Sequence, residues 1–249
     1  MESRCDPSMN LDWSILSGEA GGLILQGLAG TLKLSGWSLL FAFLIGLAFG
    51  IVRWIGSRWT EPFCWLYVEF SRNTPPVVQI LFWYFSASYI LPRWLFLEFR
   101  NIGYEFAAAV LALSIYHGAF IAEVVRAGLN AIAKGQYEAA RALGLGFAQT
   151  LHHVALPQAI RIAIPPLVNE ATALIKNTSL AMAIGVIELT YQYKHIDTFM
   201  FRGVEALAAV TVIYLVLCLS AAGIGSVLNS ALSRHHVARR VEPTLVTSE

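Results

Sequence analysis

Long uninterrupted runs of apolar residues, separated by shorter polar stretches, dominate this sequence. A helix that crosses a bilayer needs about 20 predominantly apolar residues, and the runs predict about five such spans. Glu69, Arg72 and the Pro75-Pro76 pair break the second run near its start, and Lys176 lies within the fourth. The predicted spans are Leu34–Val52, Phe63–Leu91, Glu105–Val125, Ile164–Ile187 and Ala206–Ala231. The pattern therefore predicts an all-α fold, an integral membrane bundle of about five transmembrane helices.

Composition agrees with a bilayer as the solvent. Of the 249 residues, 57% are hydrophobic and 13% are charged, whereas soluble domains carry about 25% charged residues. The formal net charge of +1 gives no indication of a nucleic-acid partner. Cys5, Cys64 and Cys218 lack any ligand-like spacing, so we expect neither a disulfide framework nor a metal site.

The distribution of positive charge selects an orientation, because cytoplasmic connections carry an excess of lysine and arginine. The connections after the predicted first and third spans and the C-terminal tail are richer in these residues than the other connections. We therefore expect an N-terminus outside the cell, with residues 1–27 as an extracytoplasmic segment. Residues 28–232 would form the transmembrane domain, and residues 233–249 a cytoplasmic tail.

The segment between the third and fourth predicted spans, residues 134–157, is expected on the same side as this tail. Its first part, Lys134–Gly144, is rich in strong helix formers and ends on a glycine suited to a helix C-cap. A second short helix can follow from Phe147 until Pro157 interrupts it. The result is a helix-turn-helix elbow outside the bilayer, although a solvated amphipathic linker would have a similar composition.

The elbow also carries a recognisable motif. Glu138-Ala139-Ala140, three residues, Gly144, nine residues and Val154-Ala155-Leu156-Pro157 resemble the EAA signature of permease subunits of bacterial ABC importers, with Val154 in place of isoleucine. Further segments resemble the polar amino acid permeases, including the glutamate/aspartate type. These segments are Tyr67–Pro75, Glu123–Gly128, Leu156–Ala159 and Ile175–Ser179.

This resemblance implies a permease subunit of the bacterial cytoplasmic membrane that imports a polar amino acid, with glutamate or aspartate as the first expectation. In this family the elbow is a coupling helix that docks on a separate cytoplasmic ATPase. By position, the docking residues here would be Glu138, Ala139, Ala140, Arg141 and Gly144. The implied partners are a second permease, identical or related, two ATPase subunits and an extracytoplasmic amino acid binding protein. ATP and Mg would be bound by the ATPase, and this chain, which lacks a GxxxxGK[ST] loop, would be no enzyme and carry no cofactor.

Polar residues within the fourth predicted span are the candidates for a substrate pathway. A lysine at mid-membrane costs about 2.5–3.5 kcal/mol on insertion scales, so Lys176 should face protein or water. At helical spacing, Asn169, Thr172, Lys176 and Ser179 fall on one face of the helix and form a polar stripe, which Glu170 and Asn177 flank. The candidate pathway residues are Asn169, Thr172, Lys176, Asn177 and Ser179. The alternative is that Lys176 pairs with a neighbouring subunit and never contacts substrate.

Other motifs have simpler structural interpretations. His117 is interpreted as a hydrogen-bonded packing residue rather than a proton relay, and the pairs His152-His153 and His235-His236 as surface residues rather than metal ligands. Arg72, Asn73 and Thr74 are interpreted as capping and anchoring residues before Pro75. Gly46 and Gly50 form a GxxxG pattern that favours close helix packing.

Two other classes of function stay open at this point. An ion-coupled secondary transporter would be expected to have more spans, often in two related halves. If the chain is a membrane scaffold without transport activity, the polar stripe would have no function in transport.

Overall fold

The computed structural model describes Trp13 and residues 18–233, and within these residues the regular secondary structure is entirely helical. Cys5, the pair His235-His236 and most of the predicted terminal segments lie outside the described residues. The helices are α1 (Glu19–Ile55), α2 (Glu61–Arg72), α3 (Pro76–Ile90), α4 (Arg93–Ile102), α5 (Tyr104–Asn130), α6 (Lys134–Ala142), α7 (Phe147–Thr150), α8 (Leu156–Asn177), α9 (Leu189–Met200) and α10 (Gly203–Ser233). A π-helical turn, Leu151–Ala155, joins α7 to α8, and a 3₁₀ segment, Thr178–Ile184, follows α8.

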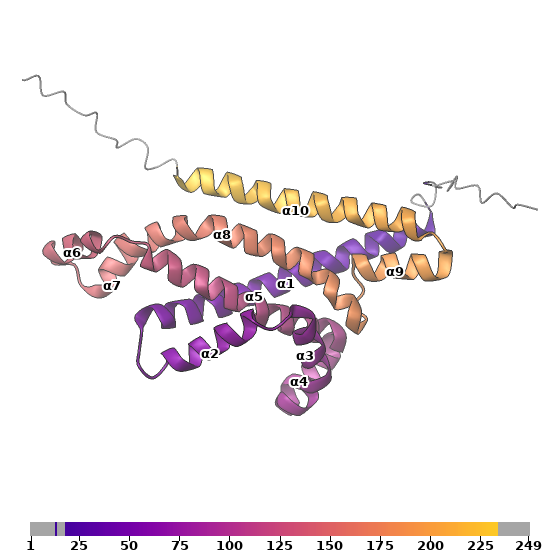
Figure 1. The fold of residues 1–249 in the computed structure, drawn as a ribbon, viewed down its shortest axis with the longest axis horizontal. Coiled ribbons are helices and arrows are strands. Elements are labelled where there is room, and N and C mark those ends of the chain that lie inside the picture. The colour runs from indigo at the N-terminus through magenta and orange to yellow at the C-terminus, as the bar shows by residue number, and fades with distance from the viewer. Residues whose placement is uncertain (1–12, 14–17, 234–249) are drawn as a thin grey trace, which may run out of the picture.

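Helix α5 forms the centre of the bundle. It packs most extensively against α1 and also contacts α8, α3, α2 and α4. Helix α10 lies along one side, against α8 and α9, while α2, α3 and α4 lie on the opposite side (Figure 1). The elbow formed by α6 and α7 projects from one end of the bundle, and α9 lies near the other end (Figure 1). The C-terminal end of α10 points toward the elbow end (Figure 1).

The number of long membrane-crossing helices is smaller than the sequence predicted. Within the described part of the chain, three helices, α1, α5 and α10, are long and apolar enough to cross a bilayer, or up to four if the bent pair Phe147–Ile184 and Leu189–Met200 counts as one span. The fourth predicted span is therefore part of a longer helical path that begins at Phe147 and bends by 46° before α9. Helix α1 is also longer than predicted: its 37 residues extend over about 55 Å. It begins within the segment 1–27 that we expected to precede the bundle.

The second predicted span is divided into two helices. Helix α2 ends at Arg72, and α3 starts at Pro76 and has only 15 residues. Pro75 adopts an extended conformation with ψ 137°, because Pro76 disfavours a helical conformation for the residue before it. The predicted break near the Pro75-Pro76 pair is thus confirmed, but the single span is wrong: only α3 is an apolar helix, and it is a short one.

Glycines in α1 allow the close approach of α1 and α5. A Cβ atom on Gly46 would lie 2.4 Å from Cγ2 of Ile121, and one on Gly50 would lie 2.7 Å from the carbonyl oxygen of Ala122. From the other side, a Cβ on Gly118 would lie 2.9 Å from Ile45. The GxxxG pattern therefore serves close helix packing, as predicted.

Candidate functional site: the elbow and the polar face of the bundle

The elbow is a helix-turn-helix, as the sequence predicted, and Gly144 makes its tight turn. The N–H of Gly144 donates to the carbonyl of Arg141 at 2.9 Å, and the N–H of Leu145 donates to the carbonyl of Ala140 at 3.1 Å. This pair of bonds is a Schellman motif, which needs a left-handed residue after the helix. Gly144 supplies it with φ 78°. The turn therefore has one fixed direction.

The expected end of the second elbow helix at Pro157 is wrong. The helical path continues from α7 through the π-helical turn into α8, and Pro157 lies in the first turn of α8. A proline inside a regular helix lacks an N–H and clashes with the carbonyl of the residue four positions earlier. Pro157 avoids this cost because it lies in the first turn of α8, directly after a wider turn in which the N–H of Leu156 donates to the carbonyl of Leu151. The elbow is consequently continuous with the helix that carries the polar stripe.

The elbow presents most of its predicted docking residues at the surface. Glu138, Ala139, Arg141 and Gly144 are exposed, whereas Ala140 is only 3% exposed. Ala140 therefore faces this chain in the structure, because one side of the short helix must pack to hold it in place. Burial also raises the pKa of the Tyr137 hydroxyl above its usual value.

A hollow of about 610 Å³ lies between the elbow and the ends of α1 and α5. Trp54 of α1 stacks on Phe147 of α7, with ring centroids 6.2 Å apart, and so connects the elbow to the bundle. An apolar cluster of Leu129, Ile132, Ala155 and Ala159 packs beneath it. The lining residues of the hollow are Trp54, Leu129, Asn130, Ile132, Lys134, Tyr137, Arg141, Leu145, Phe147 and Thr150. The elbow is thus attached to the bundle by packed side chains in addition to its two chain connections.

The polar stripe predicted on α8 is present but divides between two environments. Lys176 and Ser179 line a hollow of about 310 Å³ toward α9 and α10. Asn177 turns toward α5, and its amide lies 3.2 Å from Nε2 of His117. Thr172 uses its hydroxyl to donate to the carbonyl of Val168 at 2.9 Å, and Asn169 is exposed. The five residues therefore do not converge on one point.

His117 lies at the meeting point of α5 and α8. Its side chain is 1% exposed, and Nδ1 lies 2.8 Å from Oε1 of Glu170. With the Asn177 contact on the other ring nitrogen, both nitrogens have a partner, which a buried imidazole needs. The interpretation of His117 as a hydrogen-bonded packing residue is confirmed. Glu170, which we expected only to flank the stripe, is its main partner.

Sequence reasoning missed Glu188, which is fully buried at the bend before α9. Its carboxylate accepts from the N–H groups of Thr190 and Tyr191 at 2.8 and 2.7 Å and from the hydroxyl of Tyr214 at 2.8 Å. This is an N-cap that also connects α9 to α10. The available signal was an acidic residue just before the run that becomes α9.

The remaining candidates have structural roles. Asn73 and Thr74 donate to the carbonyls of Glu69 and Phe70 at 2.8 and 2.6 Å, so they cap the C-terminal end of α2 rather than the start of α3. Arg72 lies over the ring of Phe120 at 5.4 Å. His152 and His153 are exposed neighbours, Cys64 is buried and Cys218 is partly exposed. No cluster that could hold a metal ion occurs among the described residues.

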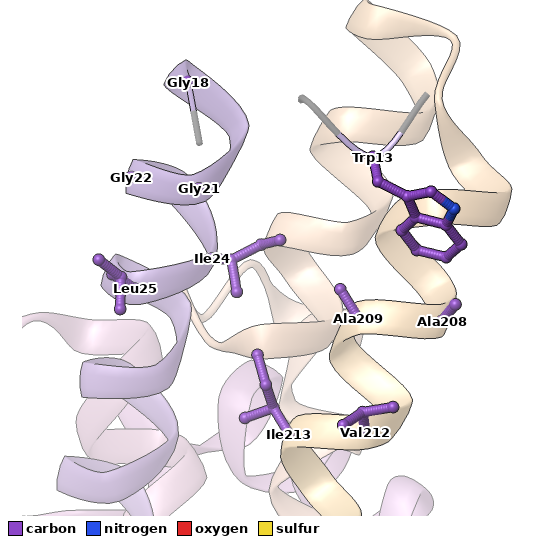
Figure 2. A pocket seen from close by; sticks show the side chains of 10 residues that line it. All are labelled: Trp13, Gly18, Gly21, Gly22, Ile24, Leu25, Ala208, Ala209, Val212 and Ile213. Carbon is purple, nitrogen blue, oxygen red and sulfur yellow. The ribbon is translucent and has the colours of Figure 1, made fainter. Parts of the chain in front are cut away.

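A further groove, of about 600 Å³, separates the beginnings of α1 and α10. Figure 2 shows Ile24 on one helix, Ala209 and Ile213 on the other, and the indole of Trp13 above α10. The lining residues are Trp13, Gly18, Gly21, Gly22, Ile24, Leu25, Ala208, Ala209, Val212 and Ile213. With so few polar groups, this groove does not suit a polar ligand.

Comparisons with known proteins identify the family. Residues 38–234 match the family described as binding-protein-dependent transport system inner membrane component. The chain is 39% identical over 212 residues to the glutamine transport system permease protein GlnP of Escherichia coli (strain K12), covering 85% of this chain and 93% of the relative. It is 32% identical over 222 residues to the glutamate/aspartate import permease protein GltJ of the same strain, covering 84% and 90%.

Solved structures agree with this assignment. The crystal structure of an amino acid ABC transporter with histidines matches with a TM-score of 0.78 and 30% identity, covering 90% of this chain and 100% of that chain. An inward-facing structure of the MetNI methionine ABC transporter has the same fold, with a TM-score of 0.70 at 22% identity. The chain therefore belongs to the family of binding-protein-dependent transport system inner membrane components, as a permease subunit of the polar amino acid ABC transporters.

Proposed function

We propose that this chain forms one half of the membrane path of an ATP-driven importer, with glutamine, glutamate and aspartate as the candidate substrates. The family membership makes it a multi-pass inner-membrane permease and one component of an ABC transporter complex with ATPase subunits. Permease components are not themselves catalytic and carry no cofactor, in agreement with the sequence-based expectation. The two relatives quoted above are named as permeases for glutamine and for glutamate and aspartate, and these names support the choice of candidate substrates.

The observation that carries the mechanism is the continuity of the elbow with α8. An exposed helix that an ATPase could grip, α6, is joined through a fixed turn to the helical path that runs from Phe147 to Ile184. Closure of two ATPases would displace α6, and a rigid helical connection transmits a rigid-body displacement that a flexible loop would absorb. Glu138, Ala139, Arg141 and Gly144 would contact the ATPase, with Ala140 holding the helix from beneath.

The proposal includes an orientation in the membrane. We place the elbow, residues 134–157, and the tail, residues 233–249, in the cytoplasm, and the N-terminal segment outside. The excess of lysine and arginine on the connections at the elbow end supports this placement. Five crossings would require α3 to span as well; its 15 residues measure about 22 Å, short of a bilayer core of about 30 Å. Local thinning of the bilayer would accommodate it.

The substrate pathway would follow the polar face of α8. The exposed ammonium group of Lys176 is suited to the carboxylate of an amino acid. The Ser179 hydroxyl beside it donates to the carbonyl of Lys176 at 2.7 Å, which leaves its oxygen as an acceptor. Asn169, Thr172 and Asn177 would continue the polar surface along the helix. Because α10 leaves most of its apolar surface exposed, this chain alone does not enclose a path. A second permease, identical or related, would supply the other wall, and an extracytoplasmic binding protein would deliver the amino acid.

The test is uptake of radiolabelled amino acids by proteoliposomes that contain the permease with its ATPase and binding protein. We expect uptake to require ATP and to ignore ion gradients, and to fall at least tenfold in Glu138→Lys. Glu98→Lys, which changes an exposed acid on α4, is the matched control. Gradient-driven uptake without ATP would instead identify a secondary transporter, and no uptake of any kind would favour a scaffold.

The pathway is tested separately. Lys176→Met should raise the concentration of amino acid needed for half-maximal uptake, while Lys33→Met, an exposed lysine on α1, should not. A Lys176→Met permease that assembles and transports at the full rate would remove Lys176 from the pathway.

A further inference from the structure

A cluster of charges ties the last turn of α1 to α5, next to the elbow. The guanidinium of Arg53 pairs with Oε1 of Glu123 on α5, and its Nε lies 3.7 Å from Oε1 of Glu61 at the start of α2. The second carboxylate oxygen of Glu123 accepts from Nη2 of Arg126 at 2.9 Å. Glu123 therefore holds two arginines, one from another helix and one from its own.

This cluster is buried more deeply than an ordinary surface ion pair. The Arg53 side chain is 7% exposed and that of Glu123 is 21% exposed. Exposed pairs contribute little, but removing one partner of a buried pair leaves an uncompensated charge and is strongly unfavourable. The contact between α1 and α5 at this point is consequently firm.

The backbone geometry explains why these charges meet. Gly50 lies one turn before Arg53, and a Cβ there would lie 2.7 Å from the carbonyl oxygen of Ala122, the residue before Glu123. The close approach of the two helices at Gly50 thus brings Arg53 and Glu123 within reach of each other. Beyond Arg53, Trp54 stacks on Phe147 of the elbow.

We propose that Glu123 is a positioning residue that clamps the end of α1 to α5, so that the elbow, α1 and α5 move as one body when the elbow is displaced. This inference rests on the proposed function and names a residue that makes its coupling efficient. Without the clamp, Trp54 and the last turn of α1 would move with the elbow while α5 stayed in place. Motion would then be lost before it reached the centre of the bundle, and ATP would be hydrolysed with less transport.

The experiment measures uptake and ATP hydrolysis in the same proteoliposomes, with the complete transporter. We expect Glu123→Gln to co-purify with its partners and to hydrolyse ATP within about twofold of the wild-type rate, while the amount transported per ATP falls at least tenfold. Glu98→Gln is the matched control and should leave this ratio unchanged. Arg53→Lys, which keeps a positive charge, should retain more coupling than Arg53→Met.

Two further measurements separate positioning from a merely structural role. The double variant Arg53→Met/Glu123→Gln should lose less coupling than the sum of the two single losses, because both changes break the link between Arg53 and Glu123. Amide hydrogen exchange over residues 50–55 should accelerate in Glu123→Gln and not in Glu98→Gln.

Three results would overturn the inference, and a fourth would overturn the proposed function. An unchanged ratio of transport to hydrolysis in Glu123→Gln would overturn the inference, as would a parallel loss of assembly, hydrolysis and transport. Additive effects of the two single changes would also overturn it. If the wild-type transporter itself shows no ATP-driven uptake, the proposed function fails, and the two failures are thereby distinguished.

Discussion

Helices α5 and α10 are both long and apolar, yet they occupy opposite environments. In the most apolar stretch of each, 61% of α5 is buried inside the protein, whereas only 6% of α10 is. Helix α10 is also the more apolar of the two. In water the more hydrophobic helix would be expected at the centre, but lipid tails are as apolar as leucine side chains and provide no such drive.

Small and polar side chains, rather than hydrophobicity, distinguish the buried helix. Helix α5 buries Ser114, His117 and six alanines, which are Ala107, Ala108, Ala109, Ala112, Ala119 and Ala122. Helix α10 instead exposes large aliphatic residues such as Leu219, Ile224 and Val227. The comparison teaches that small size and satisfied polarity indicate the core of this bundle, whereas bulk indicates a surface toward lipid or another subunit.

The largest effect should come from filling the seam between α1 and α5. Gly46→Leu would drive atoms into Ile121 and the carbonyl oxygen of Gly118, and overpacking of this kind costs about 1–3 kcal/mol or more. We expect loss of folded permease, measured by thermal unfolding in detergent. Gly223→Leu on α10, where a Cβ would meet nothing within 4 Å, is the control and should leave the unfolding temperature unchanged. Equal losses in both variants would contradict the comparison.

The buried polar contact should have the next largest effect. His117→Ala removes the partner of Glu170 and of Asn177, and an unsatisfied buried group costs about 1–3 kcal/mol. We expect a lower unfolding temperature and reduced uptake. Ser220→Ala, at an exposed position on α10, should change neither. An unaffected His117→Ala protein would show that the contact between α5 and α8 is not stabilising.

The elbow should be moderately sensitive. Gly144→Ala places a side chain at φ 78° and should destabilise the turn by about 1 kcal/mol. Gly135→Ala has open space around it and no positive φ, so it is the control. ATP-driven uptake measured side by side should fall only in Gly144→Ala, since only this change disturbs the direction of the turn. Equal uptake by the two variants would argue against a fixed elbow.

The smallest effect is expected on the exposed face of α10. Leu219 is 62% exposed, so Leu219→Ala should alter the free energy of unfolding by less than about 0.5 kcal/mol. Chemical unfolding of the purified complex measures this. A larger loss would sharpen the comparison, because it would show that a second permease covers this face in the assembled transporter.

The sequence predicted those features that depend on local pattern. The apolar runs located α1, α5 and α10, the Pro75-Pro76 pair located the break before α3, and Gly144 located the turn of the elbow. The boundaries were less accurate, because a helix continues past the bilayer without any apolar requirement, as α1 does from Glu19. Pro157 was misjudged because a proline is tolerated in the first turn of a helix, and here α8 begins directly after a π-helical turn.

Contacts between distant segments could not be predicted in the same way. Nothing local in His117 indicates that Glu170 will lie beside it, because the pairing depends on how α5 and α8 rotate against each other. The same holds for the division of the stripe, since helical spacing places Lys176 and Asn177 only relative to their own axis. Arg53 directly follows the first predicted span and Glu123 lies near the end of the third, and their opposite charges are the one signal in the sequence for their pairing.

The π-helical turn between Leu151 and Ala155 sets the angular positions of the side chains of α8, the helix that continues directly from it. A turn with one additional residue shifts the later side chains around the axis by about 100°, a little more than a quarter of a revolution. If the π-helical turn tightened to a regular α-helical turn, Lys176, Glu170 and Asn177 would rotate together around the axis of α8, relative to α5 and α10. A change of winding at one end of this rod would therefore exchange which polar groups face the interior, without any hinge within the membrane.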